Sequence, residues 1–474
     1  MIDSPTMTIN GRATMSEQTL AVINPAKGEP FVFVPDCSAA QLDDAVRAAR
    51  SSQRAWSVLP LEKRKQIVVS LAAILTDNID ELKRLLTMEQ GKTLDDAAGE
   101  IAYAAYWFQS AAELDLPVEV VEDLPERRTE THRVALGVVG AILPWNYPIL
   151  LLAWKIVPAL VAGNCIVIKP SPFTPVTTLR IGELIRDALP AGVVNIVSGG
   201  DELGRWMTEH PDIDKISFTG SSATGKRIVK SAADSMKRVT LEMGGNDAAI
   251  VFPDVDIAAV AEALFWGAFS NSGQVCVAAK RIYVHEEIYD AFRDAIIEYA
   301  GTIKIGDGAQ HGVRLGPIQN KPQYDRVRAL IEDSRAQGQT VHTIGEGVGG
   351  SGYFLPLTII DNPPDGARVV CEEPFGPVVP LLKFSDEADV VARANDSPFG
   401  LAGSVWSADL DRAASVARQL ECGTVWINGI HDSPINSPVA GHKQSGLGVE
   451  NGQHGLLEYT NAQTVILRRP APVS

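Results

Sequence analysis

The chain has 474 residues, which is more than one hydrophobic core normally covers, so two or three domains are expected. Hydrophobic residues make up 45% and charged residues 21% of the chain, as in ordinary globular proteins. The net charge of −16 argues against nucleic acid or an anionic membrane surface as a partner.

The cysteines and histidines argue against a disulfide framework and against a metal site. Five cysteines are scattered without paired spacing, and the eight histidines form no HxxxH or HxH cluster. No apolar run reaches the roughly 18 residues of a membrane span, and the N-terminal stretch has no apolar core of a signal peptide. These features predict a cytoplasmic protein with no metal and no membrane span.

The first third of the chain is predicted to be mostly helical. Residues 1–20 lack a helical pattern and are expected to be extended or poorly ordered. Ser38 and Gln41 match a capping box, which predicts a helix running from there towards Trp56. Helical periodicity continues through 61–78, 80–90 and 95–114.

Between residues 116 and 133 the pattern becomes alternating and charged, with Val118, Val120 and Leu124 as apolar side chains. This pattern predicts an exposed hairpin with one apolar face. Such a ribbon is either a plain sheet edge or an arm used in oligomerisation, because exposed apolar edges tend to be covered. The sequence alone favours neither alternative.

From residue 137 onward, buried strands alternate with helices. Strands are predicted at 137–143, 165–169, 193–197, 215–219 and 239–242, and helices at 149–162, 177–188, 202–209 and 225–235. This alternation is typical of a parallel, doubly wound sheet, in which ligands bind at the carboxyl ends of the strands.

A second α/β segment follows the glycine pair at 244–245, and we place a domain boundary near residue 245. Its first strands are predicted at 248–252 and 281–284, and its first helices at 257–268 and 288–300. The last twenty residues, which are strand-like at 464–467, have the pattern of a tail that pairs with another segment.

The loop 270–276 presents a single cysteine, Cys276, after a Gly-Gln pair and just beyond an apolar helix. The nucleophile in thiol catalysis is the thiolate, and a loop position near amide dipoles favours it. A lone cysteine is more often a small buried hydrophobe. Glu242 and Asn146 supply the carboxylate and the amide that acyl-thioester chemistry needs, so they favour the catalytic interpretation.

Glu242 ends an apolar strand before two glycines, so we expect it to project into a cleft. It is a candidate general base, and the alternative is a salt-bridged carboxylate at a strand end. Asn146 lies in the Pro-bracketed turn 144–148. Its amide is a candidate oxyanion donor, and the alternative is that it caps the helix that begins near Ile149.

The segment 218–225 closes a strand and opens a helix with two glycines separated by four residues. Helix N-termini bind phosphate, so this segment is a candidate dinucleotide site, or else a simple tight turn. Lys169 ends a neighbouring strand, where it faces either ligand or solvent. The turn 372–377 begins with two adjacent carboxylates, Glu372 and Glu373. Either one of them binds ribose hydroxyls or both are solvated.

Taken in order, these segments resemble the aldehyde dehydrogenase superfamily from about Asn24 to about Tyr459. The most specific parts are Pro-Trp-Asn-Tyr-Pro at 144–148, Phe-Thr-Gly-Ser at 218–221, Glu-Met-Gly-Gly at 242–245, Gly-Gln-Val-Cys at 273–276, Glu-Glu-Pro-Phe-Gly-Pro at 372–377 and Lys-Gln-Ser-Gly-Leu-Gly at 443–448. The resemblance implies that the protein oxidises an aldehyde to a carboxylic acid with NAD, or NADP as an alternative. The route implied is a cysteine thiohemiacetal followed by a thioester.

The resemblance also implies roles for individual residues. Cys276 would be the nucleophile, Glu242 the general base and Asn146 an oxyanion donor. Lys155 and Glu450 match positions that the family associates with proton relay. Cofactor contacts are implied for Trp145, Lys169, Ser171, Thr219, Gly220, Ser221, Gly244, Glu373 and Phe375.

The implied fold is α/β and aldehyde dehydrogenase-like, with three parts. These are a doubly wound parallel-sheet cofactor domain (1–114 and 136–244), an α/β catalytic domain (245–454) and a small β oligomerisation arm (115–135 and 455–474). The arm implies a homodimer or a homotetramer.

Three positions depart from the family pattern. Pro172 stands where many NAD-preferring relatives carry an acid that binds the adenosine ribose. The segment 438–441 replaces the usual Pro-Phe-Gly-Gly at the substrate end, and Asn246 replaces the usual lysine after the glycine pair.

Two other functions compete with the hydrolytic one. In a CoA-acylating relative the CoA thiol replaces water, and the presence of Glu242 argues against it. A non-enzymatic protein that keeps the fold usually tolerates loss of the nucleophile, and Cys276 is intact. For the substrate, a mainly apolar passage predicts aliphatic or aromatic aldehydes; its expected lining is Tyr147, Leu151, Trp154, Val275, Val277 and Val439.

Overall fold

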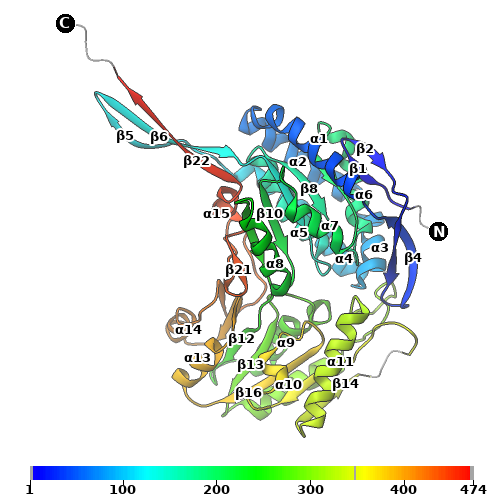
Figure 1. Cartoon of the computed structure of the whole chain (residues 1–474). Helices are drawn as coiled ribbons and strands as arrows, with labels where there is room; N and C mark the ends of the chain where they lie inside the picture. The colour runs from blue at the N-terminus through cyan, green and yellow to red at the C-terminus, as the bar shows by residue number, and fades with distance from the viewer. Residues whose placement is uncertain (1–3, 346–348, 470–474) are drawn as a thin grey trace.

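The computed structural model describes residues 4–345 and 349–469. It has two α/β lobes and a long ribbon that projects away from them (Figure 1). The helices are α1 (Ala39–Ser57), α2 (Leu61–Asp77), α3 (Ile79–Gln90), α4 (Leu94–Gln109), α5 (Pro148–Val161), α6 (Val176–Ile185), α7 (Asp201–Glu209), α8 (Ser222–Ala233), α9 (Ile257–Phe269), α10 (Tyr289–Gly301), α11 (Lys321–Ala336), α12 (Arg368–Cys371), α13 (Glu387–Asn395), α14 (Leu410–Ala417) and α15 (Gly452–Leu457), with short 3-10 turns η1 (Ser110–Glu113), η2 (Arg186–Ala188) and η3 (Ser270–Gly273).

The strands fall into two large sheets and three small ones. They are β1 (Met7–Ile9), β2 (Arg12–Thr14), β3 (Thr19–Asn24), β4 (Glu29–Pro35), β5 (Glu119–Leu124), β6 (Arg127–Ala135), β7 (Val138–Ile142), β8 (Cys165–Lys169), β9 (Val194–Ile196), β10 (Lys215–Thr219), β11 (Arg238–Glu242), β12 (Asp247–Val251), β13 (Ala279–His285), β14 (Thr340–Ile344), β15 (Leu357–Asp361), β16 (Val378–Phe384), β17 (Phe399–Gly400), β18 (Ala402–Trp406), β19 (Thr424–Ile427), β20 (His442–Lys443), β21 (Gly446–Leu447) and β22 (Thr460–Arg468).

The first lobe is built on an eight-stranded sheet in the order β2-β1-β9-β8-β7-β10-β11-β21. Its five central strands pair in parallel, and β1 and β21 join at either side in antiparallel orientation. The sequence predicted the doubly wound parallel sheet correctly. The strand order reverses beside β7, and such a switch point is where open α/β sheets bind ligands.

Local capping sets several helix ends. The capping box at Ser38 and Gln41 is present at the start of α1, as predicted. Helix α8 begins three residues earlier than its periodicity indicated, because the Ser221 side chain accepts the Thr224 N–H and caps it. The segment expected to be extended, 1–20, contributes β1 and β2 to the edge of the first sheet and begins β3.

The second lobe has a seven-stranded sheet in the order β14-β15-β16-β13-β12-β18-β19. Alternate residues of β12 enter different cores: Ala249 packs with α9 and α10, whereas Ala248 packs with α11 to α14. Because successive strand residues point to opposite faces, helices cover both sides of this sheet. The predicted resumption of α/β alternation is therefore confirmed.

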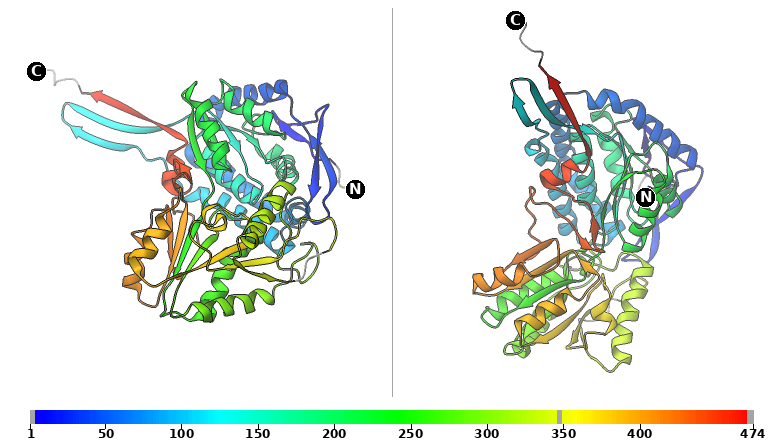
Figure 2. Two further views of the ribbon diagram at one scale, coloured as in Figure 1. Left: turned by 60° about the horizontal axis from the view of Figure 1, so that its bottom comes forward. Right: turned by 60° about the vertical axis from the view of Figure 1, so that its left-hand side comes forward.

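The chain passes from the first sheet to the second between Glu242 and Asp247, through the predicted glycine break. The chain later returns to the first lobe. Its strand β21 pairs with β11, and Leu456 and Tyr459 lie in the core of that lobe. Two further views show the lobes meeting along this crossing (Figure 2).

The projecting ribbon is the antiparallel sheet β22-β6-β5, formed by the predicted hairpin and the tail that was expected to pair. It extends beyond the body of the first lobe (Figures 1 and 2). Apolar side chains are exposed on and beside it: Val118, Val120, Val121, Leu124, Val134, Val465, Ile466 and Leu467. In the described part of the chain, none of the helices combines the length and apolarity needed to cross a bilayer.

Candidate active site

A tight reversal after α9 presents Cys276. Asn271, Ser272 and Gly273 have positive φ angles of 49°, 57° and 74°, so three successive residues lie in the left-handed region. A Cβ at position 273 would lie 2.2 Å from the Gly376 carbonyl oxygen, so this position requires glycine. The reversal leaves the Cys276 side chain half-buried.

The Asn146 amide lies against the cysteine loop. Its Nδ2 donates to the carbonyl of Gln274 at 3.0 Å, two residues before Cys276 and 128 residues away along the chain. The Asn146 carbonyl accepts from Lys92 Nζ at 3.0 Å and from Asn271 Nδ2 at 3.2 Å. The structure thus brings the predicted oxyanion donor against the loop that carries the predicted nucleophile.

The alternative role for Asn146, capping α5, is wrong. The N-cap of α5 is Tyr147, and the first free amides of the helix donate to Glu100 Oε1 at 2.8 and 3.1 Å. Lys92 Nζ pairs with the other Glu100 oxygen at 2.5 Å and lies 3.7 Å from the centroid of the Tyr147 ring. This buried pair holds the turn that carries Asn146, and no local sequence pattern indicates the pairing.

Glu242 ends β11 and is buried beside Thr219 of β10 and Gly446 of β21. Within the described residues, its Oε1 has no hydrogen-bond partner. Burial raises the pKa of Glu242 well above its ordinary value; the charge of Glu450 adds to this effect and that of Lys155 opposes it. A carboxylate with a raised pKa in a buried site is suited to accept a proton.

Lys155 and Glu450 form an ion pair of 2.5 Å with both side chains buried. Ser217 Oγ accepts from Lys155 Nζ at 3.1 Å and donates to Glu450 Oε1 at 3.1 Å. Tyr459 OH donates to the same hydroxyl at 3.1 Å. The two residues implied in proton relay are therefore in direct contact, and Glu450 and Lys155 both act on the pKa of Glu242.

The Cys276 thiol does not match the expectation that its loop favours the thiolate. Burial raises its pKa to about 12, and the carboxylates of Asp247, Glu373 and Glu242 add to the rise. The charge of Lys280 opposes it. Desolvation outweighs the amide dipoles in this protein without bound ligands.

A cavity of about 610 Å³ opens at the carboxyl ends of β7, β8 and β10, next to the switch point of the first sheet. This volume is in the range of small-molecule and cofactor sites. Its lining includes Pro172 and six of the residues expected to bind cofactor: Trp145, Lys169, Ser171, Thr219, Gly220 and Ser221.

The chemistry of this cavity fits a dinucleotide. Thr219 Oγ1 is buried without a hydrogen-bond partner in the described part of the chain, so it has a free position towards a ligand. Ser221 caps α8, whose N-terminus is favourable for phosphate. Lys169 is buried, and desolvation lowers its pKa to about 8.

The other three expected cofactor residues lie across from Trp145. The Phe375 and Trp145 rings meet edge to face with centroids 5.2 Å apart. Glu373 Oε1 accepts from the Gly245 N–H at 3.2 Å, and a Cβ on Gly244 would lie 2.1 Å from Glu373 Oε2. Glu373 is thus a packed carboxylate, and the alternative of two solvated acids is wrong for it.

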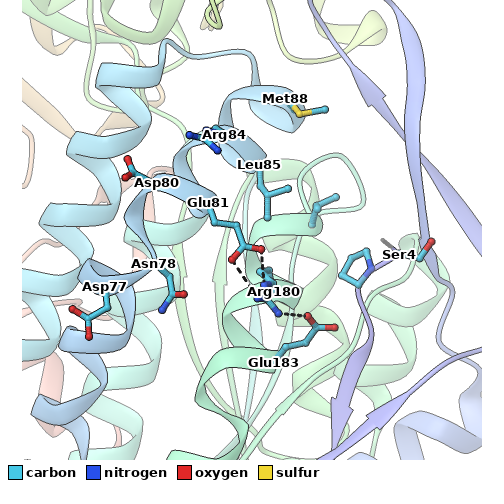
Figure 3. A pocket seen from close by; sticks show the side chains of 12 residues that line it. Ser4, Asp77, Asn78, Asp80, Glu81, Arg84, Leu85, Met88, Arg180 and Glu183 are labelled. Atoms are coloured by element: carbon cyan, nitrogen blue, oxygen red, sulfur yellow. Dashed lines mark hydrogen bonds and ion pairs between the residues drawn. The ribbon is translucent and has the colours of Figure 1, made fainter. Parts of the chain in front are cut away.

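A second hollow of about 900 Å³ lies between α3, α6 and residues 4–5, away from these side chains (Figure 3). Arg180 pairs there with Glu81 and with Glu183, each at 2.9 Å. Glu183 also accepts from Thr6 N–H and Oγ1 at 2.8 Å. Arg180, Glu81 and Glu183 are thus engaged with one another, and the lining of this hollow includes none of the residues expected to act in the reaction.

Comparisons with known proteins agree with the site. A family model described as the aldehyde dehydrogenase family matches residues 12–465. Over 464 residues the chain is 44% identical to a probable aldehyde dehydrogenase from Pseudomonas sp., covering 98% of this chain and 94% of that relative.

Solved structures agree as well and confirm the expected fold class. The NAD+ complex of aldehyde dehydrogenase from Bacillus cereus superposes with a TM-score of 0.96 at 34% identity, covering 98% of this chain and 97% of that one. An E. coli NADP dependent enzyme superposes with a TM-score of 0.95 at 36% identity, covering 98% of both chains. The chain belongs to the aldehyde dehydrogenase family and is an enzyme that oxidises aldehydes.

Proposed function

We propose that the protein is a hydrolytic aldehyde dehydrogenase in which Cys276 is the nucleophile. The observation that carries this proposal is the 3.0 Å hydrogen bond from Asn146 Nδ2 to Gln274 O. It places an amide donor next to the thiol loop from a distant part of the chain. The nearby buried carboxylate of Glu242 completes the groups that thioester chemistry requires.

In the first half of the reaction, the Cys276 thiol gives its proton to solvent water and the sulfur attacks the aldehyde carbon. The Asn146 amide and the Cys276 backbone N–H donate to the oxygen that becomes negative. A bound nicotinamide cofactor supplies the hydride acceptor that turns this adduct into a thioester. Cys276 then remains acylated.

In the second half, Glu242 accepts a proton from water, and the resulting hydroxide attacks the thioester carbonyl to release the carboxylic acid. The raised pKa of Glu242 supports this role, because a base whose pKa lies nearer neutral pH takes up a proton more readily. The same carboxylate argues against CoA as the acyl acceptor, since a CoA thiolate needs no water activated by a base.

The cofactor is NAD, with NADP as an alternative, held in the cavity lined by Trp145, Ser171, Thr219 and Gly220. Lys169 and Glu373 would contact the two riboses and Ser221 the pyrophosphate, with Phe375 and Gly244 at the nicotinamide end. The cavity's place at the switch point supports this assignment. The B. cereus structure is described as an NAD+ complex and the E. coli enzyme as NADP dependent, so these relatives are consistent with either cofactor.

The apolar side chains expected to line the substrate passage support aliphatic or aromatic aldehydes as substrates. Val275 is buried directly before Cys276, and Leu151 is buried on α5. Trp154 packs against Trp107 with ring centroids 5.4 Å apart.

We assign the first sheet to a cofactor domain (1–114 and 136–244), the second to a catalytic domain (245–454), and the ribbon to an oligomerisation arm (115–135 and 455–474). The exposed apolar side chains of the arm support a homodimer or homotetramer.

The oligomeric state tests this role of the arm. Ile466→Asp, at a side chain that is 60% exposed on the arm, should lower the mass measured by light scattering. Met236→Asp, at an 88% exposed site on the body, is the matched control. A parent that is monomeric at micromolar concentration would refute the arm assignment.

Cytoplasm is the proposed location, supported by five free cysteines that suit a reducing compartment.

The test of the reaction is NADH formation with a panel of aldehydes, with and without CoA. The parent should oxidise apolar aldehydes without CoA, and Cys276→Ala should be inactive while still binding NAD. The proposal fails if Cys276→Ala keeps its activity within tenfold of the parent, or if turnover requires CoA.

A further inference from the structure

Lys280 is a buried charged residue at the start of β13, and the mechanism above leaves it unused. Its side chain is 4% exposed. Nζ donates to Gly245 O at 2.8 Å, to Glu373 Oε1 at 2.7 Å and, in a shorter contact, to Cys276 O. An ammonium group has three N–H donors, so these three acceptors account for all of them.

The three acceptors belong to separate parts of the candidate site. Gly245 lies in the crossing that follows Glu242, Cys276 is the proposed nucleophile, and Glu373 is the proposed ribose ligand. Among these acceptors, Glu373 carries the charge, and the Phe375 ring centroid lies 5.7 Å from Nζ. A buried lysine satisfied only by groups of one site is best explained by a function at that site.

We propose that Lys280 is a positioning residue for the reaction, which ties the Cys276 loop, the Gly245 crossing and Glu373 together and stabilises the thiolate by its charge. The inference rests on the proposed function, because it requires Cys276 to be the nucleophile and Glu373 to bind cofactor. It adds a cation to a site whose other charged groups near the thiol are acids.

The charges around Cys276 support the effect on the thiol. Burial is the largest cause of the raised pKa of Cys276, and the carboxylates of Asp247, Glu373 and Glu242 add to it; the charge of Lys280 acts in the opposite direction. Removing the ammonium should therefore make the thiolate rarer, whereas removing the Glu373 charge should make it more common.

The contacts of Glu373 support the positioning role. Its side chain is 16% exposed, and both hydrogen bonds that it accepts in the described part of the chain end on Oε1. Oε2 lies against Gly244 and remains available to a ribose hydroxyl. Without Lys280, the Gly245 N–H at 3.2 Å alone would hold this carboxylate.

The first measurement is the alkylation rate of Cys276 by iodoacetamide in the ligand-free enzyme, followed by peptide mass mapping across pH. At pH 8, Lys280→Met should slow alkylation about tenfold, the equivalent of one pKa unit. Glu373→Gln should accelerate it, and Lys321→Met, at an exposed ion pair on α11, should leave it unchanged. Opposite shifts from Lys280 and Glu373 are expected from charge and not from a loss of packing.

The second measurement is NAD affinity by fluorescence titration. Lys280→Met should weaken binding severalfold in the parent but less than twofold in the Glu373→Gln background, since the two residues act together. If Lys280→Met does not fold, the Glu373→Gln alkylation rate still decides the charge effect.

Unchanged alkylation in Lys280→Met, or a Glu373→Gln rate that falls, would overturn the inference. If the parent oxidises aldehydes and Cys276→Ala does not, such a result overturns the role of Lys280 alone. If the parent is inactive with every aldehyde, the proposed function itself fails.

Discussion

Replacing Glu450 with glutamine tests how the buried Lys155–Glu450 pair controls the general base. The amide keeps the shape of the side chain but removes its charge, and it leaves the Lys155 ammonium with Ser217 Oγ at 3.1 Å. Breaking a buried ion pair from one side costs about 3–5 kcal/mol. Because the amide oxygen still accepts a hydrogen bond, we expect the loss in free energy of unfolding to be near the lower end, about 3 kcal/mol.

The same change should alter the pH dependence of thioester hydrolysis. The Glu450 charge helps to raise the pKa of Glu242, so Glu450→Gln should lower that pKa. Glu242 acts in its deprotonated form, so the acidic limb of the hydrolysis rate should move to lower pH. Lys155→Met removes the charge that lowers the pKa of Glu242, and the limb should move to higher pH.

Two measurements check this reasoning. Urea unfolding followed by tryptophan fluorescence gives the change in stability, and single-turnover hydrolysis of the acyl-enzyme between about pH 5 and 9 gives the position of the limb. If both variants lose stability while the limb stays in place, the pair is only structural. A shift in the same direction for both would contradict the electrostatic argument.

Three further predictions concern Glu242, Pro172 and Glu89, whose buried carboxylate accepts from the Val176 and Thr177 N–H groups at the start of α6. Glu242→Gln should slow turnover by about 10²–10⁴ and let acyl-enzyme accumulate, as seen by intact mass; an unchanged rate would make Glu242 a structural carboxylate. The Pro172 side chain offers a ribose neither a hydrogen-bond acceptor nor a charge. The kcat/KM values for NAD and NADP, measured with one aldehyde, should therefore differ by less than about a hundredfold, or ~2.7 kcal/mol. A preference for NAD above about a thousandfold would refute this prediction. Burial raises the pKa of Glu89 from 4.5 to about 7, so its contribution to stability is complete below 4.5 and is lost as pH rises through 7. In Glu89→Gln, the free energy of unfolding measured in urea should fall less between about pH 4.5 and 7 than in the parent, by on the order of 3 kcal/mol. The same pH dependence in both proteins would contradict the role of Glu89.

Local chemistry explains which parts of the fold the sequence could predict. The bounds predicted for the strands at 165–169 and 215–219 are those observed. The first is a continuous apolar run that ends at a lysine, and the second alternates polar and apolar residues and ends at a threonine followed by glycine. The capping box at Ser38 and Gln41 is likewise a contact between neighbours in the chain. The predicted start of α8 was late because Ser221 caps it ahead of its first apolar residue.

The supporting residues of the site could not be predicted in this way. Lys92 reaches the Asn146 carbonyl over 54 residues, and Lys280 reaches Glu373 over 93 residues. Only the tertiary fold brings these groups together. The local hint for Lys280 is that two charged residues, Lys280 and Arg281, lie near the start of a buried strand shortly after the cysteine. An isolated lysine at such a position gives no indication of its acceptors.

Burial raises the pKa of both Cys276 and Glu242 in the ligand-free protein. Each has one buried lysine nearby that opposes this effect, Lys280 for the thiol and Lys155 for the general base. Each lysine is paired with a glutamate, and that glutamate raises the pKa of the same reacting group. A charge change in the Lys280–Glu373 pair should therefore act directly on thiol reactivity, and a change in the Lys155–Glu450 pair should act directly on thioester hydrolysis. The two effects are linked through Glu242, whose charge also raises the pKa of Cys276.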